Sequence, residues 1–201
     1  MDAARVAALR DLLSSTPWVE RTRGFARTMR TSTTKTDGLL LVGTPDDEPW
    51  HLTAHLTDEA QFAQLPQLRP TLIRWNAEPD APPHLAVTVA RLEVATRGET
   101  VLVVAEQNAP EGLLQRAWDA RKAGATILSL DGGDAELQGV AHEALSVVEN
   151  DLMQVSFDSV QHLVSAAVGE VPTAAMTSGR RGFRDRLGRM LDTISGPRTD
   201  R

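Results

Sequence analysis

The sequence of 201 residues contains no cysteine and no tyrosine, and aromatic residues make up only 4% of it. Without cysteine, the chain can form no disulfide, thiolate metal site or cysteine nucleophile. No apolar run approaches the roughly 20 residues that a membrane-spanning helix requires. The N-terminal stretch MDAARVAALRDLL carries too many charges for a secretory signal peptide. The sequence therefore predicts a soluble, cytoplasmic protein of ordinary single-domain size.

Acidic side chains are concentrated in the middle of the chain, and both ends are basic. Residues 36–170 contain seven basic and 21 acidic side chains, whereas residues 1–35 and 171–201 each contain seven basic and three acidic ones. A charge distribution of this kind is common on solvated surfaces, and it also occurs where a chain contacts a partner. Both interpretations of the basic ends remain open at this point.

Short apolar runs alternate with helical patterns along most of the chain. The expected strands are 38–43, 71–75, 100–105, 125–130 and 145–149. The expected helices are 18–31, 46–62, 84–96, 110–123, 134–144 and 152–168. This alternation predicts right-handed βαβ units with helices on both faces of a parallel sheet. The expected fold class is α/β, a three-layer doubly wound architecture with a five-stranded, mainly parallel sheet.

The ends of the chain are expected to add helices to this domain. Residues 1–170 are predicted to form one α/β domain, with N-terminal helices in 1–35, and residues 171–201 a connector and a basic amphipathic helix. The arginines of that last helix are Arg180, Arg181, Arg184, Arg186 and Arg189. Such a helix could contact a protein partner or an anionic membrane, or close a homodimer or homotetramer. Nucleic acid is disfavoured as a partner because no recognised motif and no interleaved aromatic residues accompany the arginines.

Three segments resemble the sugar isomerase (SIS) domain family and, within it, the sedoheptulose phosphate isomerases. They are GLLLVGTPDDEPWHLTAHL (38–56), GETVLVVAEQNAPEGLLQRAWDARKAGATILSLDGG (98–133) and FDSVQHLVSAAVGEV (157–171). The resemblance covers roughly residues 1–170 and implies an SIS-type α/β fold. It also implies two loops that hold a sugar phosphate.

Both of these loops have lost most of their phosphate-binding groups. Where the family has a G-x-G-x-S type turn, residues 43–47 read GTPDD, and Pro45 supplies no N–H. Where the family has an S-x-S-G-x-[ST] type loop, residues 105–110 read AEQNAP. Thr44, Gln107 and Asn108 remain as the expected polar contacts for a ligand.

Carboxylates are expected to gather at the carboxyl edge of the sheet, where the ligand crevice of such folds lies. They are Asp46, Asp47, Glu48, Glu106, Glu111, Asp131 and Asp134. Some of them are candidates for capping helices, Asp46, Asp47 and Asp134 above all. A helix N-terminus favours an anion by about 0.3–1 kcal/mol. Two like charges about 4 Å apart at an effective dielectric of about 20 repel by about 4 kcal/mol. The sequence therefore disfavours a sugar phosphate in this crevice.

His51 and His55 lie four residues apart on an expected helix and therefore on one face of it, where two imidazoles can share a divalent metal. In the resembling isomerases, a histidine and a glutamate at these positions bind zinc or take part in catalysis. Gln161 matches a glutamine of the same site, and the family's second catalytic histidine falls on Gly169. His162 is expected to point about 100° away from Gln161. The resemblance thus implies a shell of His51, His55 and Gln161 for zinc, with an acidic residue needed to complete it. As the alternative, His51 and His55 are ordinary packing or surface histidines.

Two functions follow from these observations. The first is a non-catalytic or regulatory SIS-like protein, a pseudoenzyme, that binds a small carbohydrate-type ligand or a protein partner. The sequence assigns it no cofactor, with zinc as the one candidate. The alternative is a divergent metal-dependent sugar phosphate isomerase that uses His51, His55 and Gln161. The loss of one histidine and of both phosphate loops favours the first, because isomerisation needs a positioned acid–base pair and a stabilised enediolate.

Overall fold

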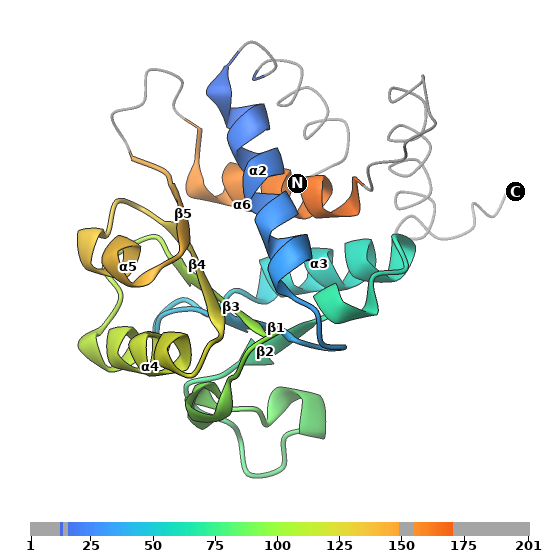
Figure 1. Ribbon diagram of the computed structural model, residues 1–201. Helices are drawn as coiled ribbons and strands as arrows, with labels where there is room; N and C mark the ends of the chain where they lie inside the picture. Colours follow the sequence, from blue (N-terminus) through green and yellow to red (C-terminus); the bar gives the residue numbers. More distant parts are fainter. Residues whose placement is uncertain (1–12, 14–15, 149–154, 171–201) are drawn as a thin grey trace, which may run out of the picture. The chain divides into compact units, whose positions relative to one another are not determined.

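The computed structural model describes residues 13, 16–148 and 155–170. The chain divides into two units, of which the first comprises Met1–Val19 and Val171–Arg201 and the second Glu20–Glu170. The second unit is an α/β domain (Figure 1). The amphipathic helices expected near the two ends lie almost entirely outside the described residues, as does most of the first unit. No helix in the described part of the chain is long and apolar enough to span a membrane.

A single parallel sheet of five strands forms the centre of the domain. The strands are β1 Leu39–Val42, β2 Pro70–Ile73, β3 Thr100–Ala105, β4 Thr126–Asp131 and β5 Glu143–Ser146. Their order is β2-β1-β3-β4-β5, and every neighbouring pair is parallel. The predicted α/β fold with five strands is therefore confirmed. The fifth strand begins at Glu143, two residues before the expected start.

Strands β1 and β3 are buried along their whole length, which explains why their sequences are continuous apolar runs. On β3, Val101 and Val103 belong to the core cluster that also contains Leu113 and Ala117 of the helix Glu111–Lys122. Because side chains alternate along a strand, Leu102 points to the opposite face of the sheet. One strand thus supplies two cores, one on each face.

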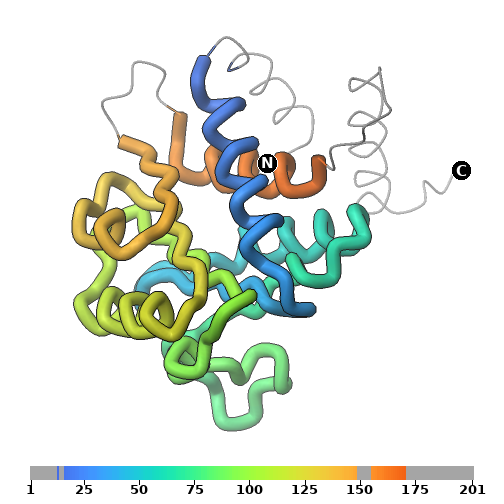
Figure 2. The backbone as a smooth tube through the Cα atoms, in the orientation of Figure 1, coloured from blue at the N-terminus to red at the C-terminus, as the bar shows by residue number. Residues whose placement is uncertain are grey.

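Helices cover both faces of the sheet. α4 Glu111–Lys122 and α5 Ala135–Val140 lie on one face, and α3 Trp50–Phe62 and α6 Phe157–Gly169 lie on the other (Figure 1). The tube in Figure 2 shows α2 Pro17–Ser32 crossing on the side of α3 and α6. Arg30 of α2 donates from Nη1 to the carbonyl oxygen of Ala167 on α6, at 2.7 Å. α3 also packs directly against α6. This pair of helices positions the candidate site.

The prediction of an α-helix at residues 84–96 is wrong. In its place are the short 3-10 helices η2 Pro83–Leu85 and η3 Val89–Val94, and a further one, η1 Pro66–Leu68, precedes β2. The backbone of Arg74, just after β2, donates to the carbonyl of Val87 at 2.8 Å and accepts from the amide of Val89 at 2.9 Å. These bonds form a bridge between Arg74 and Thr88. Because the bridge holds Thr88 extended, a continuous helix cannot pass through it.

Candidate functional site

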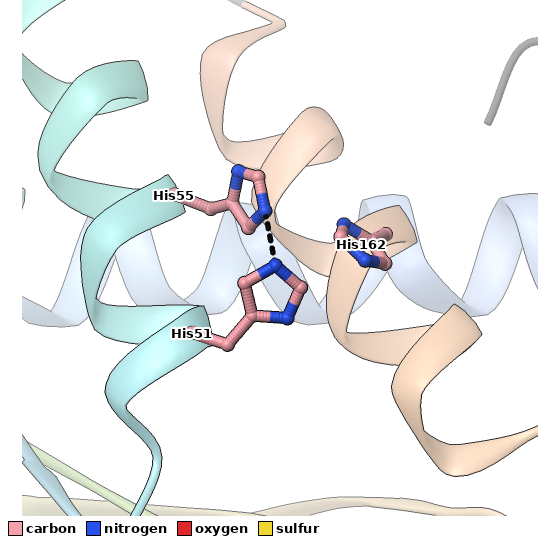
Figure 3. Close-up of side chains that lie close together, drawn as sticks. All are labelled: His51, His55 and His162. Carbon is pink, nitrogen blue, oxygen red and sulfur yellow. Dashed lines mark hydrogen bonds between the residues drawn. The ribbon is translucent and has the colours of Figure 1, made fainter. Parts of the chain in front are cut away.

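Three histidines from two helices lie together on one side of the sheet. Figure 3 shows the rings of His51 and His55 next to each other on α3, with His162 facing them from α6. The ring centroid of His162 lies 4.7 Å from each of the other two, which are 4.5 Å apart. Each histidine offers one ring nitrogen, and these three atoms lie within 4.8 Å of one another. We call His51, His55 and His162 the histidine cluster.

The local sequence explains how the cluster forms. α3 begins at Trp50, after the loop that leaves the carboxyl end of β1, so His51 lies in the first turn of this helix. In α6, Asp158 lies in the first turn and His162 follows four residues later. Residues four apart on a helix share a face. Two such pairs meet because α3 and α6 pack against each other.

The ring nitrogens of the histidine cluster contact one another and the carboxylate of Asp158. Nε2 of His55 lies 2.9 Å from Nε2 of His51, so one of these atoms donates a hydrogen bond to the other. The two carboxylate oxygens of Asp158 lie 3.4 Å from Nδ1 of His51 and 3.6 Å from Nε2 of His162. That Nε2 atom is buried and has no hydrogen-bond partner among the described residues. A buried polar atom without a partner costs about 1–3 kcal/mol, so its presence calls for an explanation.

Burial favours the neutral forms of His162 and His55. It lowers the pKa of His162 to about 4, with the neighbouring His55 as the next cause and Asp158 acting in the opposite direction. The pKa of His55 is also lowered, first by burial and then by the charge of His51. Neutral imidazoles have a free lone pair, which is the form that binds a metal. Three imidazole nitrogens suit zinc and related divalent ions. The donor set of the cluster therefore fits a bound metal.

The third member of the cluster differs from the expected one. The family resemblance implies Gln161 as the third member, whereas the structure brings His162 to the pair on α3 and leaves Gln161 half-buried beside it. Most of the circumference of α6 is buried, so its apolar pattern does not reveal which polar residue faces α3. The buried residues are Phe157, Val160, His162, Leu163, Val164, Ser165, Ala167, Val168 and Gly169. The i,i+4 spacing of Asp158 and His162 was the signal that could have indicated this face.

Gly169, where the resembling isomerases have their second histidine, has no space for a side chain as the structure stands. The carboxylate of Glu59 on α3 occupies the place where a Cβ atom would be. A histidine at this position would require Glu59 to move. The cluster therefore uses a different residue of α6 from the one that the family pattern implies.

The loop from β1 to α3, residues 43–49, folds tightly on itself. The backbone N–H of Asp47 donates to the carbonyl and the hydroxyl of Thr44, at 3.3 and 3.2 Å. Gly43 is required here because the carbonyl oxygen of Asp47 occupies the space of a Cβ atom. The N-cap of α3 is Pro49, with no side-chain cap, so the expected capping by Asp46 or Asp47 is wrong. Thr44, a predicted ligand contact, is half-buried and already bonded within the loop.

An open pocket of about 400 Å³ lies beside this loop. It is lined by Pro45, Asp46, Asp47, Glu48, Trp50, Arg74, Trp75 and Asn76. Its one cationic side chain, Arg74, donates from Nε to Glu48 at 2.6 Å and lies over the ring of Trp50, 4.6 Å from the centroid. Asp46 and Asp47 are exposed and form no ion pair with any described residue. The pocket therefore offers a phosphate no unpaired cation.

The loop from β3 to α4 is closed by a carboxylate. Asp134 caps α5, as predicted, by accepting from the amides of Glu136 and Leu137 at 3.0 and 3.1 Å. Its second oxygen accepts from the backbone N–H of Ala109 at 2.8 Å. An amide that a phosphate loop would direct at its ligand is thus occupied by the protein itself. Gln107 and Asn108 are exposed on this loop, and no hydrogen bond of their side chains is found among the described residues.

Asp131 does not contribute charge to the crevice as expected. It is fully buried at the end of β4. Its carboxylate accepts from Ser129 Oγ at 2.8 Å, from the amide of Gly133 at 2.9 Å and from Gln138 Nε2 at 2.9 Å. Three donors satisfy it within the protein. The exposed negative charge near the sheet edge comes instead from residues such as Asp46 and Asp47.

No family model matches the sequence, and no curated protein matches it. Solved structures do resemble the chain. A candidate sugar binding protein from Salmonella typhimurium LT2 has a TM-score of 0.57 at 14% identity, over 96% of this chain and 54% of that one. A candidate phosphosugar isomerase from Silicibacter pomeroyi DSS-3 has a TM-score of 0.53 at 15% identity, over 94% and 53%. The sugar isomerase domain of the RpiR transcription factor from Sphaerobacter thermophilus has a TM-score of 0.51 at 10% identity, over 94% and 97%.

These similarities define the class of fold. This chain spans about half the length of the first two proteins and nearly all of the third domain. At such low identities the structures show the fold alone. The chain has the α/β fold of sugar isomerase (SIS) domains, and the fold implied by the sequence resemblance is confirmed.

The depressed pKa of His162 predicts how stability depends on pH. This pKa is about 4 in the folded chain, against 6.5 for an unperturbed histidine. The unfolded chain therefore binds more protons between these values, and the free energy of unfolding falls as the pH is lowered from about 6.5 to about 4. We expect His162→Gln to reduce this fall, measured by urea titration with a metal chelator present. The exposed His84, changed to Gln, is the control, and equal pH dependence in all three proteins would contradict the prediction.

Proposed function

We propose that this chain is an SIS-fold protein that binds a divalent metal ion through His51, His55 and His162 and uses the site to recognise a ligand, without isomerase activity. The convergence of the three imidazoles carries this proposal. The burial of His162 supports it, because a metal would give a partner to an imidazole that makes no hydrogen bond through Nε2 among the described residues. Zinc is the metal that this donor set suits best in a chain without cysteine.

The burial of the cluster also suits a binding site. The side chain of His162 is only 4% exposed, whereas that of His51 is 52% exposed, so solvent and small molecules can reach the cluster from the side of His51. Sites with three protein ligands keep a coordination position open, where zinc can hold an oxygen atom of a ligand. The cluster is therefore suited to binding a hydroxyl- or carbonyl-bearing molecule.

The surrounding loops favour a ligand without phosphate. The backbone N–H of Ala109 donates a hydrogen bond to Asp134, and the guanidinium of Arg74 is paired with the carboxylate of Glu48. The exposed polar side chains that remain near this edge include Asp46, Asp47, Gln107 and Asn108. Carboxylates and amides of this kind accept hydrogen bonds from hydroxyl groups. We therefore propose an unphosphorylated, carbohydrate-type ligand, bound close to Gln107 and Asn108.

A binding or regulatory role agrees with the chemistry of the cluster. Isomerisation needs a group that can both give and take a proton near neutral pH. The pKa of His162 lies near 4 and that of His55 is lowered, so neither imidazole is well placed to donate a proton at pH 7. The same fold occurs in the sugar isomerase domain of a transcription factor, which is a regulatory protein.

The proposal also includes the location and assembly of the chain, as a cytoplasmic homodimer or homotetramer.

The second candidate is a divergent metal-dependent sugar phosphate isomerase, with His162 in the place expected for Gln161. The observation that favours it is the histidine cluster itself, because three protein ligands are typical of catalytic zinc sites rather than structural ones. Interconversion of an aldose phosphate and a ketose phosphate by the zinc-loaded chain, lost in His51→Ala, would establish this function and overturn the non-catalytic one.

Zinc titration tests the metal centre. We expect the full chain to bind one zinc ion per chain in isothermal titration calorimetry, and His162→Ala to weaken binding at least about 100-fold because a ligand is removed. His84→Ala is the matched control, since His84 is an exposed histidine outside the cluster. Equal zinc affinity in the wild type and His162→Ala would contradict the proposed centre.

Thermal shifts with paired sugars test the ligand class. Glucose, fructose and ribose, each beside its terminal phosphate ester, would be added to the zinc-loaded chain. We expect the unphosphorylated member of at least one pair to raise the melting temperature more than its phosphate ester, because no unpaired cation lies in the pocket. Asn108→Ala should reduce that rise. Saturable stabilisation by the phosphate esters alone would show that the loops still bind phosphate.

A further inference from the structure

We infer that Asp158 is a positioning residue of the metal centre, whose carboxylate orients the imidazoles of His51 and His162 as ligands. This inference rests on the proposed centre and assigns a role to an acidic residue beside it. Asp158 lies in the first turn of α6, and its side chain is 56% exposed. Asp158 therefore contacts the cluster from its solvent-exposed side.

The two oxygens of this carboxylate face two different histidines. Oδ1 lies 3.4 Å from Nδ1 of His51, which is on the other helix, and Oδ2 lies 3.6 Å from Nε2 of His162, one turn along its own helix. Both distances are within the range of an ion pair and longer than a hydrogen bond of good geometry. No other carboxylate among the described residues lies within ion-pair distance of the three rings. Asp158 thus links the two helices through the cluster.

A carboxylate beside one ring nitrogen determines what the other nitrogen can do. A neutral imidazole carries its proton on one nitrogen and a lone pair on the other. Asp158 favours the proton on Nδ1 of His51, and the lone pair then lies on Nε2, which is the nitrogen directed at His55. Histidine ligands of metals commonly donate their second N–H to a carboxylate in this way. The arrangement prepares His51 to bind with Nε2.

The contact between His51 and His55 agrees with this assignment. Their Nε2 atoms are 2.9 Å apart, so one proton must lie between them. If His51 is protonated on Nδ1, that proton belongs to His55, and His51 is the acceptor. A metal bound by both nitrogens requires this proton to move to the other nitrogen of His55. Asp158 holds His51 in the ligand form throughout, so only His55 has to change its tautomer.

A simpler role for Asp158 is the stabilisation of α6, because an acidic residue in the first turn interacts favourably with the helix dipole. This role accounts for an acidic residue in the first turn, but it does not require the two oxygens to face imidazoles on two helices. Ser156 already caps the helix by accepting from the amide of Ser159 at 3.2 Å. The two roles predict different effects on metal binding.

The test compares Asp158→Asn with the wild type and with Asp58→Asn, in the full chain. Asp58 is an exposed carboxylate of α3 near His55 and outside ion-pair distance of the rings, so its substitution removes the same charge without the same contacts. Affinities for Zn²⁺ would be measured by calorimetry. Ligand sets would be compared through the visible absorption of the Co²⁺ forms.

We expect Asp158→Asn to weaken Zn²⁺ binding by about 10- to 100-fold, the usual effect of losing an outer-shell partner, and Asp58→Asn to weaken it far less. The Co²⁺ spectrum should keep its shape in both variants, because the three nitrogen ligands stay in place. Asp158→Glu, which retains a carboxylate, should recover part of the affinity.

Three results would overturn the inference. Unchanged Zn²⁺ affinity in Asp158→Asn would show that Asp158 acts only on the helix. A changed Co²⁺ spectrum would show that Asp158 is itself a metal ligand. Equal losses in Asp158→Asn and Asp58→Asn would reduce its role to general charge. Absence of metal binding by the wild type would instead overturn the proposed centre as a whole.

Discussion

The packing of α3 against α6 is the contact on which the candidate site depends. The two helices are about one hundred residues apart in the sequence, and both cover the same face of the parallel sheet. Each carries a pair of polar residues at i,i+4, His51 with His55 and Asp158 with His162. Neither pair could hold a metal strongly alone. Their meeting buries His162 and lowers its pKa, and its Nε2 has no hydrogen-bond partner in the part of the chain that the structure describes.

A second constraint is the use of carboxylates inside the loops at the sheet edge. Asp134 joins the β3–α4 loop to α5, and Glu48 holds Arg74 and the backbone of Trp75. The backbone N–H of Ala109 and the guanidinium of Arg74 are thus bonded within the protein. The described groups that converge as possible metal ligands lie on the helix pair α3 and α6 and not in these loops.

The sequence predicted the sheet well because buried parallel strands such as Thr100–Ala105 are apolar runs between turn residues, a strong and local signal. It failed at residues 84–96, where pairing of Arg74 with Thr88 overrides the helical pattern, and such pairing is not local. It identified His51 and His55 because their spacing alone places them on one face. It missed His162, because the apolar pattern of a helix that is buried on nearly all sides does not show which face meets α3.

The central claim is that the three imidazoles act together as one metal centre. X-ray absorption at the zinc edge, on the full chain loaded with one equivalent of zinc, tests it most directly. The account predicts imidazole nitrogens at about 2.0–2.1 Å as the main protein ligands, with a loss of imidazole scattering in His162→Ala. A zinc shell without imidazole ligands, or a spectrum that does not change in His162→Ala, would contradict it.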